Sequence, residues 1–408
     1  MDPLIIVPLV IVVALFFDFT NGFHDTANAM ATPIATGAMK PKTAVALAAV
    51  MNLVGAFLST EVSLTISKGM LNDDPEKGGS LLPPAIIFAA LTGAILWNLI
   101  TWLYGLPSSS SHALFGGLIG AAVASAGMGA VHFDKVMEKV LIPALFAPLI
   151  AGAAAALATL TAYLITGRSD AARKKNGIAT GRARFKIGQI FSSSLLALSH
   201  GTNDAQKTMG IITLALVSGS FVSKDAPVQF WVILSAAIAI ALGTYMGGWR
   251  IIKTMGSGLS EIRPAQGFAA EISSGATILS SSFLGFALST TQVASGSVIG
   301  SGLGRRGAKI RWNKAGQIAL AWLVTLPAAG IVGAASAYLV SIGTVGLIID
   351  GAILLAAIYG IFRVSARNKI NHRNVATSDV EMVAAKALRS PRQVRKSEKK
   401  AAKGKGKK

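Results

Sequence analysis

The sequence of 408 residues contains no cysteine, which excludes disulfide bonds and metal sites built from thiolates. Charged residues are scarce as well, at 14% of the chain, whereas hydrophobic residues make up 52% and the mean hydropathy is +0.58. A chain of this length with so few charges is too apolar to be a water-soluble globular protein. The composition therefore predicts an integral membrane protein.

The apolar stretches lack the alternation of lipid-facing and lumen-facing residues that a membrane β-barrel requires. They are continuous instead, and about as long as a helix needs to cross a bilayer. Such stretches are residues 4–22, 43–66, 83–104, 141–166, 229–249, 316–340 and 343–362. The 43 glycines, often beside alanine or serine, allow helices to approach closely in lipid. We expect an all-α polytopic membrane protein whose first apolar stretch belongs to the mature fold.

Acidic residues are outnumbered, since 38 lysines and arginines against 18 aspartates and glutamates give a net charge of +20. The basic residues gather in three blocks, 167–186, 304–314 and 363–408. By the positive-inside rule, all three blocks are expected to face the cytoplasm, where they can also contact anionic lipid. This placement explains the charge without nucleic-acid binding. The charges in loop 67–82 give no clear positive-inside signal, so the side of the membrane on which this loop lies follows only from counting spans.

Polar motifs interrupt the apolar sequence twice, at corresponding places in two halves. Asp25 and Asp204 lie in the first and second copy of one motif, 179 residues apart. A second polar element contains His112 in one half and Gln292 in the other, 180 residues apart. Two halves with matching polar breaks are typical of secondary transporters built from inverted repeats, with the binding site near the middle of the membrane.

This repeat divides the chain into four parts. We expect a first transmembrane repeat at 1–166, a basic cytoplasmic linker at 167–186, a second repeat at 187–362 and a basic, disordered tail at 363–408. If the segment around Asp204 is re-entrant, all three basic blocks lie on the cytoplasmic side of the membrane. The amino terminus then lies on the opposite, outer side. The fold expected is thus an inverted-repeat transporter with broken or re-entrant helices.

Ionisable side chains in the apolar spans indicate function, because each costs about 3 kcal/mol at the bilayer centre unless it is paired or hydrated. Asp25 and Asn28, like Asp204 and Lys207, are three residues apart and share a helix face. We expect the two carboxylates, assisted by Asn28 and Asn203, to bind the coupling cation or proton. The alternative is that both aspartates cap helices and that Lys207 only neutralises Asp204.

Hydroxyl side chains precede a glycine-rich apolar segment in each half. Helix N-termini with free N–H groups and several hydroxyls suit a tetrahedral oxyanion. The alternatives are a simple helix cap or hydrogen bonds between helices; for His112, which can titrate near neutral pH, the alternative is a hydrogen-bonded structural imidazole. The residues expected to bind substrate are Ser109, Ser110, Ser111, His112, Ser289, Thr290, Thr291, Gln292 and Lys207.

The motifs resemble those of the PiT family of inorganic phosphate transporters. Asn-Gly-Phe-His-Asp-Thr-Ala-Asn at 21–28 and His-Gly-Thr-Asn-Asp-Ala-Gln-Lys at 200–207 look like the paired signature of this family. The elements at 107–112 and 289–292 look like its Ser/Thr-rich elements, and 264–271 is similar to a further family segment. The resemblance implies a homodimeric inverted-repeat membrane protein that carries inorganic phosphate together with a cation.

Departures from the family pattern indicate which cation is transported together with phosphate. Sodium-coupled members tend to have Gly-x-Asn-Asp-x-x-Asn in both copies, whereas this chain has His24 in the first copy and Lys207 at the end of the second. Bacterial low-affinity members, held to be proton-coupled and to carry a metal–phosphate complex, look closer. Gln292, where the family often has histidine, argues against a strictly symmetric site.

We therefore expect a proton-coupled phosphate symporter of a bacterial inner or plasma membrane, with phosphate and the lipid bilayer as its partners and no resident cofactor. Protonation of a carboxylate beside the site would offset the repulsion of an incoming dianion. A sodium-coupled phosphate or sulfate symporter of the same fold is the first alternative, and an anion channel is the second. An enzyme is not expected, because the sequence has no histidine-rich metal cluster, Walker-type loop or nucleophile motif.

Overall fold

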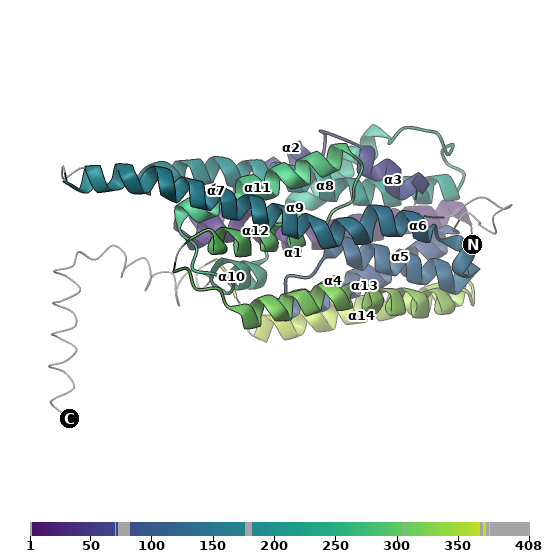
Figure 1. Ribbon diagram of the computed structural model, residues 1–408. Coiled ribbons are helices and arrows are strands. Elements are labelled where there is room, and N and C mark those ends of the chain that lie inside the picture. The colour runs from purple at the N-terminus through teal and green to yellow at the C-terminus, as the bar shows by residue number, and fades with distance from the viewer. Residues whose placement is uncertain are drawn as a thin grey trace, which may run out of the picture.

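The structure is a computed structural model that describes residues 2–69, 71, 82–175, 182–305, 307–367, 370–372 and 375. The described residues are almost entirely helical, with two isolated β-bridges and no longer strand among them (Figure 1). The helices are α1 (Pro3–Ala35), α2 (Pro41–Gly55), α3 (Glu61–Gly69), α4 (Pro84–Leu103), α5 (Ser110–Ala126), α6 (Phe133–Val136), α7 (Ile142–Lys175), α8 (Arg182–Ser218), α9 (Phe230–Met246), α10 (Trp249–Ser257), α11 (Pro264–Phe283), α12 (Thr290–Leu303), α13 (Trp312–Val340) and α14 (Thr344–Arg367). A 3₁₀ turn at Met128–Ala130 precedes α6, and a π-helical turn at Met137–Leu141 joins α6 to α7.

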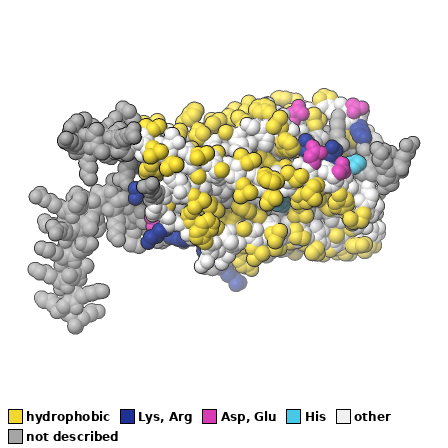
Figure 2. Space-filling model, viewed as in Figure 1, with side chains coloured by type: hydrophobic (Ala, Val, Ile, Leu, Met, Phe, Trp, Pro, Cys, Tyr) yellow, Lys and Arg dark blue, Asp and Glu magenta, His cyan; other side chains and the backbone are white. Residues whose placement is uncertain are grey.

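Within the part of the chain that the structure describes, five helical segments are long and apolar enough to cross a membrane by length and composition. They are α1, α4, the stretch Phe133–Ile165, α13 and α14; α9 and α10 form a sixth if this pair, bent by 67°, is one span. On the face in Figure 2, hydrophobic side chains cover the sides of the bundle and most charged ones lie toward its two ends. The prediction of an all-α polytopic membrane protein is confirmed.

The helix breaks do not lie at the aspartate motifs. Asp25 is inside α1, a continuous helix of 33 residues, and Asp204 is inside α8, a continuous helix of 37 residues. The expectation that the segment around Asp204 is re-entrant is therefore wrong. Polar side chains of this motif bond back to their own helix: the hydroxyl of Thr202 donates to the carbonyl of Leu198, and Gln206 donates to the carbonyl of Thr202.

The breaks lie instead in the turns that precede the Ser/Thr runs and inside two predicted spans. Gly105 has φ +66° between α4 and α5, and Gly285 has φ +72° between α11 and α12. These left-handed conformations are accessible to glycine at little cost. The apolar stretch 43–66 is divided between α2 and α3, and 229–249 ends at the bend after α9, where Gly247 has φ +74°.

The two halves interlock through matching helix pairs. Helix α5 of the first half packs against α13 of the second, whereas α12 of the second packs against α7 of the first. Likewise, α1 packs against α9 and α8 packs against α2. This exchange of partners is the arrangement that an inverted repeat produces, although the boundaries expected for the two repeats stay predictions.

Glycines permit the closest of these contacts at equivalent places. Gly120 on α5 lies against the backbone of Gly330, and Gly300 on α12 lies against the backbone of Gly152. A Cβ atom at either position would overlap the facing backbone. Small residues at such crossings let membrane helices pack backbone to backbone.

The ends of the bundle differ in what they carry. Figure 1 shows α1 beginning at one end and α7 extending beyond the bundle at the other. Gly304 packs against Ala156 and Thr159, which puts the basic block 304–314 beside the half of α7 that leads to the linker. Most of loop 67–82, the middle of the linker and the tail from residue 376 lie outside the described residues.

Replacing Gly300 by alanine should destabilise the fold. The added Cβ meets backbone atoms, which cannot move aside as a flexible side chain does, so we expect a loss of about 1–3 kcal/mol. The matched control is Gly316→Ala on α13, where an added Cβ meets no atom within 4 Å. Thermal unfolding of the purified variants in detergent measures the difference, and equal midpoints would contradict the packing described for α12 and α7.

Candidate functional site

The two aspartates and the two Ser/Thr runs meet in the interior of the bundle. Helices α1 and α8 pack against each other, and α12 begins beside both of them. Asp25 and Asp204 are both buried, with at most 1% of their surface exposed. Because an isolated carboxylate in such a place is very costly, its hydrogen-bond partners decide whether it can be charged.

Thr290, in the first turn of α12, joins the two carboxylates. Its hydroxyl lies 3.1 Å from Oδ2 of Asp204 and 3.4 Å from Oδ2 of Asp25. The Nδ2 atom of Asn28 donates to the hydroxyls of Thr290 and Thr291, at 3.3 and 3.1 Å. A hydroxyl has one proton to donate, so Thr290 can serve only one carboxylate at a time.

Asp25 has three further partners. Ser110 at the start of α5 donates to its Oδ2 at 2.9 Å, and Thr291 donates to its Oδ1 at 3.1 Å. The Nδ1 atom of His24 lies 2.6 Å from Oδ1. The other nitrogen of this imidazole lies 3.3 Å from the hydroxyls of both Thr101 and Ser108. The first carboxylate is thus held by α1, α5 and α12 together.

Asp204 is held mainly by its own helix. His200 lies one turn before it, with Nε2 2.8 Å from Oδ2, and Lys207 lies one turn after it, with its ammonium group paired to Oδ1. Lys207 is fully buried and also donates to the carbonyl of Leu288 at 3.0 Å. His200 lies 3.9 Å from Oδ2 of Asp25, so one imidazole faces both carboxylates.

Helix starts complete the site. The hydroxyl of Ser109 caps α5 by accepting from the N–H of His112 at 3.1 Å, and Ser289 caps α12 by accepting from the N–H of Gln292 at 3.3 Å. The hydroxyl of Ser111 donates to the carbonyl of Leu288 at 3.0 Å. The predicted caps are therefore present, and each leaves other N–H groups of the first turn available to an anion.

The structure does not bring every predicted residue to the carboxylates. Asn203 points to the end of α11, where its Nδ2 donates to Ser282 at 3.0 Å. His112 and Gln292 are buried in the first turns of α5 and α12, and among the described residues neither side chain bonds to Asp25 or Asp204. Among the described residues, the side-chain oxygens of Asn28, Asn203 and Gln292 have no hydrogen-bond partner.

His24 and His200 were missed as site residues. His24 directly precedes Asp25 in the motif, and the spacing of four between His200 and Asp204 places both on one face of α8. That spacing was the signal available in the sequence. Asp25, His200 and Asp204 each offer a ligand atom within 4.8 Å of the others, a donor set that could hold a metal ion.

Comparisons with known proteins agree on one family. A family model described as the phosphate transporter family matches residues 21–333. A probable low-affinity inorganic phosphate transporter of Mycobacterium leprae is 53% identical over 370 residues, covering 90% of this chain and 86% of the relative. A protein of the same description from Bacillus subtilis is 41% identical over 342 residues, covering 84% of this chain and 99% of the relative. A solved sodium-dependent phosphate transporter shares the fold, with a TM-score of 0.71 at 23% identity over 83% of this chain and 99% of that one.

Removing the shared hydroxyl by Thr290→Val should destabilise the protein. Valine keeps the shape but removes the donor that Thr290 offers to one or the other buried carboxylate, which we expect to cost about 1–3 kcal/mol. The control is Thr277→Val, because this half-buried hydroxyl donates only to the carbonyl of Ser273 on its own helix. Thermal unfolding in detergent compares the two, and a loss no larger at Thr290 than at Thr277 would refute the bridging role.

Proposed function

The chain belongs to the phosphate transporter family, and we propose that it is a symporter that carries inorganic phosphate across a bacterial membrane together with protons. It is a transporter and not an enzyme. The observation that carries the proposal is the meeting of two buried carboxylates with the N-termini of α5 and α12 in one hydrogen-bond network. The N-termini offer donors for the anion, and the carboxylates offer sites for protons.

The proposed coupling between phosphate and protons follows from the charges of the two carboxylates and of phosphate. With both carboxylates ionised, a phosphate dianion at the helix starts would be repelled, and Ser110, Thr290 and Thr291 would keep donating to the aspartates. Protonation of Asp25 or Asp204 removes a negative charge and releases hydroxyls to donate to phosphate. Phosphate and protons therefore favour the same state of the site, which is what symport requires.

Lys207 supports protons over sodium as the coupling ion. It occupies the place in the second repeat that Asn28 occupies in the first, 179 residues earlier. Its ammonium group is a fixed positive charge on Asp204, where a neutral side chain would leave room for a mobile cation. We propose that Lys207 takes the place of one transported cation and leaves a proton as the mobile one.

The cluster of Asp25, His200 and Asp204 favours a second candidate substrate, a neutral metal–phosphate complex. Two carboxylates and an imidazole suit ions such as Mn²⁺ or Zn²⁺ better than Mg²⁺, which prefers oxygen ligands. In this form the metal belongs to the cargo, and its charge would offset that of the phosphate beside the aspartates.

Two other functions predict different behaviour. A sulfate symporter could use the same hydroxyls and N–H groups, but sulfate does not titrate as phosphate does, so the pH dependence of competition separates them. An anion channel would not need two carboxylates at its site, and it would show no counterflow. Location in the inner or plasma membrane, a cytoplasmic basic tail and a homodimer complete the proposal.

The test of the substrate and of the coupling ion is uptake of labelled phosphate into proteoliposomes. A proton or a sodium gradient is imposed in separate arms, each with and without Mg²⁺ or Mn²⁺ and with excess unlabelled sulfate. Proton-driven uptake that sulfate does not inhibit supports the proposal. Sodium dependence would overturn the coupling, strong sulfate competition would overturn the substrate, and a metal requirement would favour the metal–phosphate complex.

Asp25→Asn and Asp204→Asn should each abolish most proton-driven uptake. An amide cannot exchange a proton, and the loss of one interaction worth about 1.4 kcal/mol already lowers binding about tenfold. The matched control is Asp350→Asn, because Asp350 is also a buried carboxylate but bonds to Thr92 and Ser336 instead. Unchanged uptake in both variants, or an equal loss in the control, would refute the coupling role.

Lys207→Asn should make uptake dependent on sodium. The second repeat then carries the same Asp-x-x-Asn pair as the first, and a cation site opens where the ammonium group was. The control, Lys186→Gln, removes a lysine from the first half of the same helix, where it donates to the carbonyl of Gly37 at 3.1 Å. Uptake at low and high sodium, at fixed pH, measures the effect; a variant that transports as before without sodium would contradict it.

A further inference from the structure

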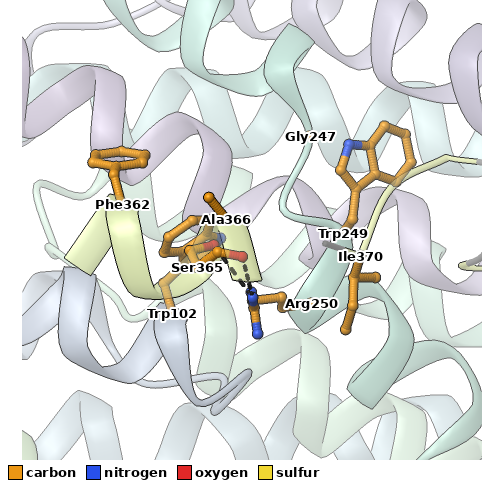
Figure 3. Close-up of a pocket in the computed structure, with 8 residues that line it drawn as sticks. All are labelled: Trp102, Gly247, Trp249, Arg250, Phe362, Ser365, Ala366 and Ile370. Atoms are coloured by element: carbon orange, nitrogen blue, oxygen red, sulfur yellow. Dashed lines mark hydrogen bonds between the residues drawn. The ribbon is translucent and has the colours of Figure 1, made fainter. Parts of the chain in front are cut away.

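A candidate second site lies where α4 and α14 end, next to the polar motif of α1 but separate from the bonds that hold the aspartates. A cavity of about 210 Å³ opens between the end of α4, the bend between α9 and α10, and the end of α14. Its lining includes Trp102, Gly247, Trp249, Arg250, Phe362 and Ser365 (Figure 3). None of these residues bonds to Asp25 or Asp204, although the ring of Trp102 lies 5.1 Å from the ring of Phe23, two residues before Asp25.

Arg250 sets the charge of this cavity. Its guanidinium group donates to the carbonyl of Leu103 at 3.2 Å and to the carbonyl and hydroxyl of Ser365 at 3.1 and 3.2 Å. It also lies 5.8 Å from the centre of the Trp102 ring. These contacts fix a cation at the cavity and orient it, which favours an anionic ligand.

The walls beside Arg250 are aromatic and apolar. Figure 3 shows Trp102 and Phe362 on one side of Arg250 and Trp249 and Ile370 on the other. The Nε1 atom of Trp102 is buried, and it has no hydrogen-bond partner among the described residues. A ligand that accepts a hydrogen bond and carries an apolar part would match both the donor and the walls.

The depth of the cavity identifies the kind of ligand. Trp102 precedes the last residue of α4, Gly247 directly follows α9, and Ser365 lies in the last turn of α14. Because α4 and α14 are long and apolar enough to span a membrane, we expect a cavity at their ends to lie near the headgroup region, where tryptophan and arginine are typical. Lys253 on α10 and Arg363 on α14 are exposed and add to the positive potential.

We propose that this cavity binds the headgroup of an anionic phospholipid. The phosphate group would lie against Arg250, accept a hydrogen bond from the indole of Trp102, and place the glycerol and first acyl carbons along Phe362. Free phosphate would pair with Arg250 but would have no apolar part to contact the walls. A zwitterionic lipid would place its own positively charged group near Arg250, which would repel it.

The site is linked to the turn between α4 and α5. Arg250 holds the carbonyl of Leu103, and Thr254 on the same helix donates to the carbonyl of Gly105 at 2.8 Å. That turn leads directly to Ser109, the cap of α5. A bound lipid would therefore stabilise α10 and α14 around the turn that positions the Ser/Thr run.

The test uses the full-length protein, purified in detergent, with phosphatidylglycerol, phosphatidylcholine or inorganic phosphate as the probe. We expect native mass spectrometry to retain phosphatidylglycerol and thermal unfolding to shift upward with this lipid. In Arg250→Gln, binding should weaken about fivefold, the equivalent of about 1 kcal/mol per basic residue at a membrane surface. The control, Lys314→Gln, removes one exposed positive charge elsewhere and should bind as the unmodified protein does.

Three outcomes would overturn the site. These are equal binding of phosphatidylcholine, an equal thermal shift with inorganic phosphate alone, and equal binding by Arg250→Gln and Lys314→Gln. If Arg250→Gln does not fold, Trp102→Phe replaces it, since this variant keeps the ring but removes the indole donor and should also weaken binding. None of these results depends on transport, so the lipid site and the proposed function are tested separately.

Discussion

The need to bury two carboxylates inside a membrane bundle governs the arrangement of the whole molecule. Asp25 and Asp204 can be charged there only if donors surround them, and α1, α5, α8 and α12 each supply some. No single helix could do so, because a helix offers its own neighbours at spacings of three and four residues on one face only. The crossing of α1 and α8 and the convergence of two helix starts follow from that requirement.

The symmetry of the fold and the asymmetry of the site have different physical origins. Helix packing depends on the size of the side chains at the crossing. Gly120 in the first half and Gly300 in the second can therefore both allow close backbone contact. The site depends on charge, and Asn28 and Lys207 occupy equivalent positions with different charges. One carboxylate is consequently bonded to hydroxyls and an imidazole, whereas the other is neutralised by an ammonium group. A duplicated scaffold thus contains two unlike halves of one site.

The sequence predicted the helical class, the duplication and the capping serines because each leaves a local pattern: hydropathy, spacing or residue type. The helix breaks predicted from the sequence were misplaced. A polar motif inside an apolar run has the same composition whether the helix breaks there or continues with its polar side chains bonded to its own backbone. Thr202 and Gln206 do the latter. The position of Asn203 beside Ser282, and the bridging by Thr290, depend on how distant helices cross, which no local pattern records. The spacing of four residues between His200 and Asp204, by contrast, is a local pattern that places both on one face of α8.

The exchange of helix partners between the halves also has a consequence for biosynthesis. Helix α5 packs against α13, and α13 is synthesised only after α8 to α12. Until then, the face of α5 that carries Gly116 and Gly120 lacks its permanent partner, whereas the first turn can already bond to α1 through Ser110 and Asp25. During this interval that glycine-lined face of the nascent first half is open to lipid or to the insertion machinery. Assembly of the bundle therefore ends, rather than begins, with the contacts that close it around its polar centre.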